Sequence, residues 1–225
     1  MRSIAARLIE GAAKTIKKAD ELFDEARLLA GEGHVARALL LHQISLEECG
    51  KAELLYVSLT EVLRGQPIDL KKLAKVLAKH ATENKTNAYF LPKFDAEVSA
   101  GERSDSTAAA SAFNEMKNAF HNESNDLKNA SLYVDFDGSF KAPSEVITKQ
   151  QLADVFDRNG QFMFMAMEKL RLVMRWATDL DAAAGEVSAL WAALGLDALD
   201  RSQPETIEAF SKRLEGMFAA LEKKA

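Results

Sequence analysis

Apolar side chains recur every three or four residues over most of the chain, the spacing that places them on one face of a helix. Only 4 prolines and 11 glycines interrupt this pattern, and they cluster between stretches rich in good helix formers. The pattern therefore predicts an all-α protein. The predicted long helices run from about Ser3 to Ala30, His34 to Arg64, Asp69 to Phe90, along the apolar stripe from Phe113 to Leu127, and from about Thr148 to Leu180. Long helices with short connections imply an antiparallel bundle of about five helices.

The pattern changes after the fourth predicted helix. Leu132 to Gly138 alternates apolar and polar residues and ends in a turn dipeptide, so it is predicted to be extended, and Pro143 closes the loop. Two shorter helices are predicted in the tail, at about Glu186–Leu194 and Pro204–Lys223. We therefore predict a bundle domain over residues 1–180 and a helical C-terminal extension over residues 181–225, packed on the bundle or on a second subunit.

Composition excludes several classes of protein. The 225 residues are 48% hydrophobic and 28% charged, which is typical of a folded globular chain. The formal net charge of −5 excludes a uniformly basic nucleic-acid-binding protein. Cys49 is the single cysteine, so no intrachain disulfide can form, which fits a reducing cytosol. Apolar runs fall far short of the roughly 20 residues of a membrane span, and we expect a cytoplasmic protein without membrane contact.

The motifs present predict neither a cofactor nor a metal. The chain has no His-Glu-x-x-His pair, and Glu47 and Glu48 are followed three residues later by Gly50 and Lys51 instead of the histidine of a di-iron bundle. The Gly31–Gly33 segment lacks the third glycine of a dinucleotide-binding loop.

Charge is unevenly distributed. From Arg64 to Lys93, seven basic residues stand against two acids, whereas from Asp181 to Ser211 six acids stand against one arginine. The basic region is either a phosphate-binding surface or an ordinary solvated helix face.

The second predicted helix carries two adjacent acids. Glu48 falls inside its apolar arc and is predicted to point into the bundle, while Glu47 falls outside and forms a surface pair with Lys51. A buried carboxylate needs a cation or hydrogen-bond donor. His80 and Asn84, on the apolar face of the third predicted helix, offer that partner. This polar interior is either a satisfied network that fixes helix register or part of a functional site.

Lys128, Asn129 and Tyr133 lie where the fourth predicted helix meets the extended segment. A lysine, an amide and a phenol at a helix end can bind phosphate and assist proton transfer. The alternative is that these residues simply end the helix.

Three segments stand in a characteristic order. They are Ile44–Lys51, His80 with Lys85, and Leu127–Phe136 followed by Pro143. In sequence and spacing they resemble the AbiV-type abortive-infection family, a branch of the HEPN superfamily, over roughly Ala26 to Leu180.

The resemblance implies a HEPN-like bundle used by bacteria against phage, in which infected cells stop growing before phage are released. Many HEPN proteins are metal-independent ribonucleases that act as homodimers through an Arg-Asn-x-x-x-His element. Its Arg steadies phosphate charge and its His handles the proton of the attacking ribose 2′-hydroxyl. At the matching place this chain offers Lys128, Asn129 and Tyr133 as candidate catalytic residues. The supporting polar groups would be Glu47, Glu48, Lys51, His80, Asn84 and Lys85.

Two functional hypotheses follow. The first is a phage-defence effector that engages RNA or the translation machinery, in which Lys128 keeps the phosphate-binding charge of the family's arginine. The second is a non-catalytic module that binds a protein partner, a phage product or a cognate regulator. It is favoured by Tyr133 in place of histidine, because a phenol with a reference pKa near 10 is a poor general base at pH 7.

Overall fold

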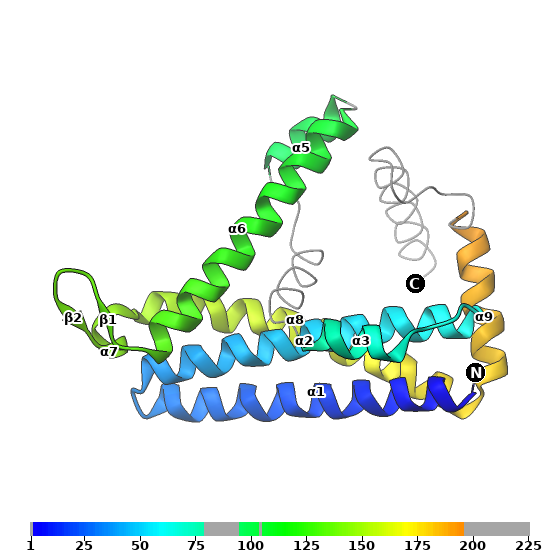
Figure 1. Ribbon diagram of the computed structural model, residues 1–225, viewed down its shortest axis with the longest axis horizontal. Helices are drawn as coiled ribbons and strands as arrows, with labels where there is room; N and C mark the ends of the chain where they lie inside the picture. The colour runs from blue at the N-terminus through cyan, green and yellow to red at the C-terminus, as the bar shows by residue number, and fades with distance from the viewer. Residues whose placement is uncertain (1, 79–94, 104, 196–225) are drawn as a thin grey trace, which may run out of the picture.

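The structure is a computed structural model that describes residues 2–78, 95–103 and 105–195, and these ranges are almost entirely helical (Figure 1). The helices are α1 (Arg2–Gly31), α2 (Val35–Leu63), α3 (Leu70–Leu77), α5 (Asp95–Glu102), α6 (Ser106–Leu132), α7 (Pro143–Val146), α8 (Lys149–Thr178) and α9 (Leu180–Ala193). The strands β1 (Asp135–Phe136) and β2 (Phe140–Lys141) form one small hairpin. The predicted all-α fold class is confirmed.

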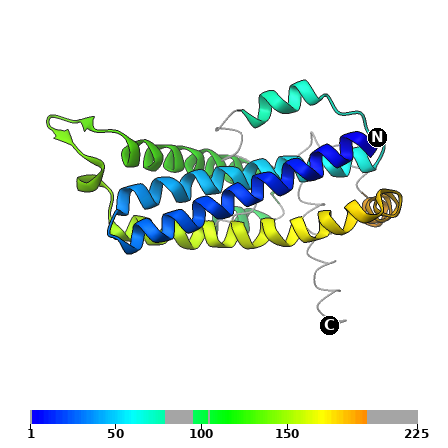
Figure 2. The ribbon, with the colours of Figure 1, turned by 90° about the horizontal axis from the view of Figure 1, so that it is seen from below.

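Helices α1, α2 and α8 lie side by side and form the body of the bundle (Figure 2). Helix α2 is central, since it packs against α1, α8, α6 and α9, and more than half of its 29 residues are buried. Leu39, Leu46 and Leu59 of α2 are among the largest fully buried side chains. A helix surrounded in this way has no single solvent-facing side.

Small residues bring α1 close to α2. Ala5, Ala12, Ala19 and Ala26 recur at every seventh position of α1, and each is at most 1% exposed. A methyl side chain occupies little space, so the two helix backbones can approach. The Ser45 hydroxyl of α2 accordingly donates a hydrogen bond to the main-chain oxygen of Ala19 at 2.8 Å.

Polar side chains fix where several helices begin. Asp105 accepts a hydrogen bond from the Ala108 amide at the start of α6, and Asp179 does the same for two amides at the start of α9. Thr148 and Gln151 form a reciprocal capping box at the start of α8.

Helix α6 leaves the body of the bundle at an angle, and only its C-terminal end packs on the start of α2 (Figure 1). There Leu127 and Ala130 pack against Ala36 and Leu39. The chain then becomes extended and forms the β1–β2 hairpin, whose turn contains Gly138 with a φ of 70°. This left-handed conformation favours glycine. The predicted extended segment is therefore confirmed.

Three predicted helix boundaries differ from the structure. Helix α3 ends at Leu77, with Ala78 as its C-cap, instead of continuing toward Phe90. Helix α5 occupies part of the polar stretch that sequence reasoning treats as a linker. Helix α9 begins at Leu180, six residues before the predicted Glu186, because Asp179 caps it directly after α8.

The C-terminal extension is only partly described. Helix α9 packs on α2 and contributes Ala183 and Val187 to the core. The predicted helix over Pro204–Lys223 lies outside the described residues, so the division of the chain at residue 180 stays a prediction. No helix within the described ranges combines the length and apolarity needed to cross a membrane.

Candidate functional site

A buried ion pair joins α6 to α2 near the end of α6. The Lys128 Nζ lies 2.6 Å from the Glu47 Oε1. The Glu47 side chain is 4% exposed and that of Lys128 is 17% exposed. A carboxylate removed from water in this way is stable as an anion only beside a cation or several donors. The pair therefore fastens the two helices together.

The roles predicted for the two acids of α2 are wrong. Glu47, expected on the surface with Lys51, is the buried acid, while Glu48 is the partly buried acid that pairs with Lys51 at 2.6 Å. The physical reason is the packing of α6 on the side of α2 that the apolar arc assigns to solvent. Lys128 makes burial of Glu47 acceptable by supplying the compensating charge.

The three candidate catalytic residues separate into one internal and two external groups. Lys128 is turned inward by its contact with Glu47, whereas Asn129 and Tyr133 are exposed. The Tyr133 amide donates to the Asn129 main-chain oxygen at 3.0 Å and closes the last turn of α6. The predicted helix end is thus observed at Tyr133, and its phenol is positioned at the surface.

Three supporting residues cannot be placed. His80, Asn84 and Lys85 lie outside the described residues, so the predicted contact of Glu48 with His80 and Asn84 stays a prediction.

A second ion pair of the same kind joins α2 to α8. The Lys169 Nζ lies 2.6 Å from the Glu53 Oε2, and the Glu53 side chain is 7% exposed. Burial raises the pKa of Glu53, and the nearby Lys169 opposes that shift. Glu47 and Glu53 thus each place an acid of α2 opposite a lysine of a different helix.

A histidine that sequence reasoning missed lies at the centre of the same half of the bundle. His42 is fully buried, and its ring lies 4.9 Å from that of Phe23 and 5.4 Å from that of Phe156. The Asn159 amide nitrogen donates to its Nδ1 and to its main-chain oxygen, both at 3.2 Å. Burial lowers the pKa of His42 to about 4, so the imidazole is neutral at pH 7.

Helical spacing could have found both members of this cluster. His42 lies between Leu39 and Leu46 on a stripe of buried α2 positions, and Asn159 continues the α8 stripe that contains Val155 and Met163. A polar residue inside an apolar stripe is the signal of a buried hydrogen-bonded group.

Chemistry based on Cys49 or on a metal cluster finds no support among the described residues. Cys49 is buried, its thiol lies 3.3 Å from the Met163 sulfur, and burial raises its pKa, so it is unreactive as a nucleophile. Within the described ranges, His, Cys, Asp and Glu side chains do not gather in groups of three that could hold a metal ion.

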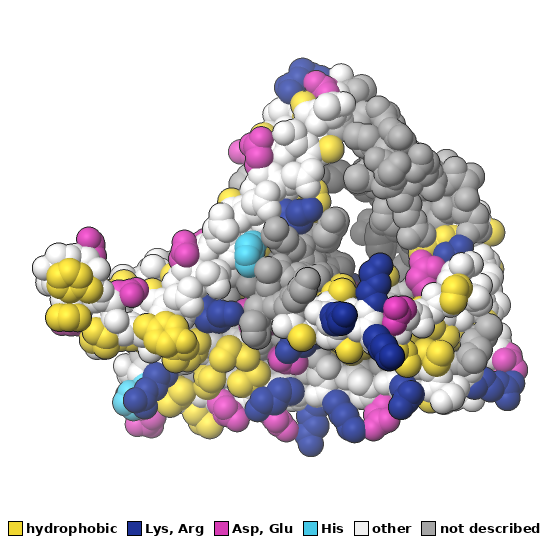
Figure 3. Space-filling view, viewed as in Figure 1, with side chains coloured by type: hydrophobic (Ala, Val, Ile, Leu, Met, Phe, Trp, Pro, Cys, Tyr) yellow, Lys and Arg dark blue, Asp and Glu magenta, His cyan; other side chains and the backbone are white. Residues whose placement is uncertain are grey.

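An apolar surface extends from the end of α6 over the hairpin. We call it the hairpin surface; it consists of Tyr133, Val134, Phe136 and Phe140, which are 59%, 60%, 67% and 77% exposed. Its two phenylalanine rings contact each other at 5.0 Å, and the hairpin projects beyond the bundle (Figures 1 and 3). Asp135, Asp137 and Glu145 flank it, against the single cation Lys141. The surface is therefore apolar and locally acidic.

Comparison with known proteins identifies the family. The sequence profile of the family described as AbiV (HEPN_AbiV) matches residues 7–163, from α1 into α8. A protein of Sinorhizobium fredii named uncharacterized protein y4gJ is 39% identical over 114 residues, which are 50% of this chain and 59% of that protein. The chain thus spans less than two thirds of the length of this curated relative. No solved structure matches significantly. Because the family profile covers well over half of the sequence, the chain belongs to the AbiV family of HEPN proteins.

Proposed function

We propose that the protein is an abortive-infection effector that acts by binding a protein partner, either a phage product or a cognate regulator. The AbiV family supports the role in abortive infection. The hairpin surface supports the mode of action, because monomeric proteins seldom expose several large apolar side chains together unless they bind something.

The charge around the hairpin surface favours a protein over RNA. Nucleic-acid surfaces gather lysines and arginines opposite phosphates, whereas the hairpin carries Asp135 and Asp137 in its strand and turn. Lys128, the cation that would hold phosphate beside Asn129 and Tyr133, is bound to Glu47 inside the bundle. A partner with an apolar groove and basic rim fits the hairpin surface best.

Removing the two phenylalanine rings tests this proposal. We expect Phe136→Ala/Phe140→Ala to abolish protection of a bacterial culture against phage and to leave the unfolding free energy within about 0.5 kcal/mol of the wild type. Both rings are largely exposed, so little core packing is lost. Plaque counts and urea denaturation measure the two effects.

The matched control is Phe164→Ala. Phe164 is 67% exposed, like Phe136, but lies on α8 far along the sequence from the hairpin. It should retain protection. Full protection by the double hairpin variant would contradict the proposal, and equal loss in the Phe164 variant would remove its specificity.

Metal-independent cleavage of RNA is the second candidate function. It is favoured by Asn129 and Tyr133, which lie one helical turn apart and are both exposed at the end of α6. A homodimer that brings two such ends together is part of this candidate, as in many HEPN ribonucleases.

A cleavage assay on total bacterial RNA tests this second candidate. If it is correct, purified protein cleaves RNA in the presence of EDTA, and Tyr133→Phe and Asn129→Ala abolish cleavage without lowering the melting temperature. Their exposure makes a large stability effect unexpected. Intact RNA under all conditions, including added phage lysate, would reject cleavage and leave the binding module.

A further inference from the structure

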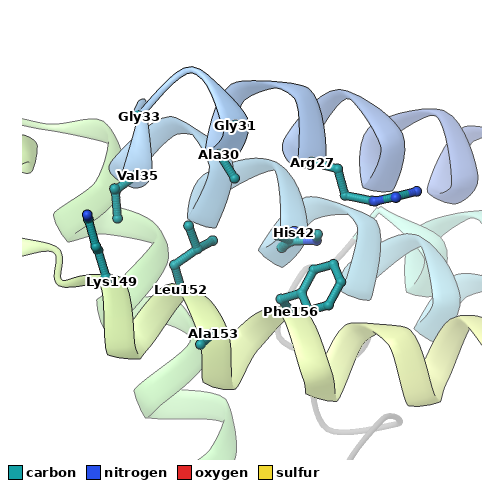
Figure 4. A pocket seen from close by; sticks show the side chains of 10 residues that line it. All are labelled: Arg27, Ala30, Gly31, Gly33, Val35, His42, Lys149, Leu152, Ala153 and Phe156. Atoms are coloured by element: carbon teal, nitrogen blue, oxygen red, sulfur yellow. The ribbon is translucent and has the colours of Figure 1, made fainter.

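An open pocket of about 560 Å³ lies where the end of α1, the start of α2 and the start of α8 meet (Figure 4). Its apolar wall includes Val35, Leu152 and the Phe156 ring. Two glycines of the α1–α2 connection, Gly31 and Gly33, also line it, and a Cβ at either position would meet nothing within 4 Å. The absence of side chains at these two positions keeps this wall of the pocket open. The volume suits a small organic molecule.

The electrostatics of the pocket favour an anion. Arg27 and Lys149 both line it; in Figure 4, Lys149 lies on the side of Val35 and Arg27 on the side of His42 and Phe156. Val35 and Lys149 are also the first residues of α2 and α8, so the positive ends of two long helix dipoles meet there. Neither helix has an acidic residue in its first turn, and the N-cap of α2 makes no side-chain hydrogen bond.

A buried hydrogen-bond donor lines the same pocket. The Asn159 amide nitrogen is identified by its contact with the His42 main-chain oxygen, which only accepts hydrogen bonds. This nitrogen also donates to Nδ1 of His42, so in the neutral imidazole the proton is on Nε2. Within the described ranges, that Nε2 is buried and has no hydrogen-bond partner. A ligand atom that accepts a hydrogen bond would satisfy it.

We propose that this pocket binds a small anion with a planar, hydrogen-bond-accepting ring, the chemistry of a nucleoside 5′-phosphate. The ring would lie against Phe156, beside the Nε2–H of His42, and the phosphate would lie at Lys149 and the start of α2. Arg27 adds a second cation at the ring side, where it can contact an additional acceptor. This site is separate from the hairpin surface and goes beyond the proposed function.

Calorimetric titration of the full chain tests the proposal, with AMP, GMP, CMP and UMP as probes and adenosine and inorganic phosphate as comparisons. We expect at least one nucleotide to bind more tightly than its nucleoside or phosphate alone. Arg27→Ala and Lys149→Ala should each weaken that binding about tenfold, the usual effect of removing one charge-assisted contact. Ala153→Leu, which adds bulk at an exposed lining position, should abolish it.

Lys17→Ala provides the matched control. Lys17 is an exposed lysine of α1 outside the pocket, in an ion pair with Glu21, and its removal should leave nucleotide binding unchanged. A 5′-phosphorylated RNA trinucleotide that binds more tightly than the mononucleotide would assign the site to an RNA end. Equal or weaker binding would assign it to a free nucleotide.

Two results would overturn the proposal. One is failure of all four nucleotides to bind. The other is equal binding of phosphate alone with the same sensitivity to Arg27→Ala and Lys149→Ala, which would indicate an adventitious ion only. Neither result bears on the hairpin surface, because Phe136 and Phe140 do not line this pocket.

Discussion

Lys128→Ala is expected to lower the free energy of unfolding by about 2–4 kcal/mol. The substitution leaves Glu47, 3% exposed, without its lysine in the contact between α2 and α6. The residual 17% exposure of Lys128 places the expected loss at or below the range for a fully buried pair. Urea denaturation at pH 7 measures it.

Two further variants separate a structural lysine from a catalytic one. The exchange Glu47→Lys/Lys128→Glu keeps one charge of each sign in the contact, so it should recover part of the lost stability and also part of the phage protection. Lys169→Ala is the matched control, since it leaves the buried Glu53 of the same helix without its lysine 2.6 Å away. Unchanged stability in Lys128→Ala, with protection lost and not recovered by the exchange, would instead establish a catalytic Lys128.

The sequence predicts the fold well because its strongest signals are local. Helical periodicity, the Asp105 and Thr148 caps and the alternation after Leu132 each act within a few residues, and the structure shows the corresponding elements. The early end of α3 at Leu77 is different. Its apolar residues continue in the sequence, but a helix boundary also depends on tertiary contacts that periodicity does not contain.

The site was harder to predict because it depends on which helices surround α2. A single apolar arc describes a helix packed on one side, and α2 is packed on several. Glu47 was therefore assigned to solvent although Lys128, distant in sequence, lies opposite it. The pairing of Asn159 with His42 has the same origin, since 117 positions separate them and only the packing of α8 on α2 joins them.

Mild acid is expected to destabilise the fold through His42. Its pKa is lowered from 6.5 to about 4 in the folded protein, so between these values the unfolded chain binds a proton that the folded chain does not. Stability is therefore fully present above pH 6.5 and declines as pH falls toward 4. At 1.36 kcal/mol per pH unit, the decline attributable to this group reaches about 3 kcal/mol. Urea denaturation at pH 7.5 and pH 4.5 measures the total change.

The contribution of His42 is isolated by a variant and by a direct titration. His42→Phe keeps an aromatic ring between Phe23 and Phe156 but cannot bind a proton, so its stability should fall less between the two pH values. Phenylalanine is larger than histidine, so NMR titration of the wild-type imidazoles provides a second measurement that needs no substitution. His34, exposed at the start of α2, should titrate near pH 6.5, whereas His42 should stay neutral below pH 5. Because Asn159 binds Nδ1 and the aromatic rings exclude water, a His42 that titrates together with His34 would mean that this half of the bundle opens to solvent.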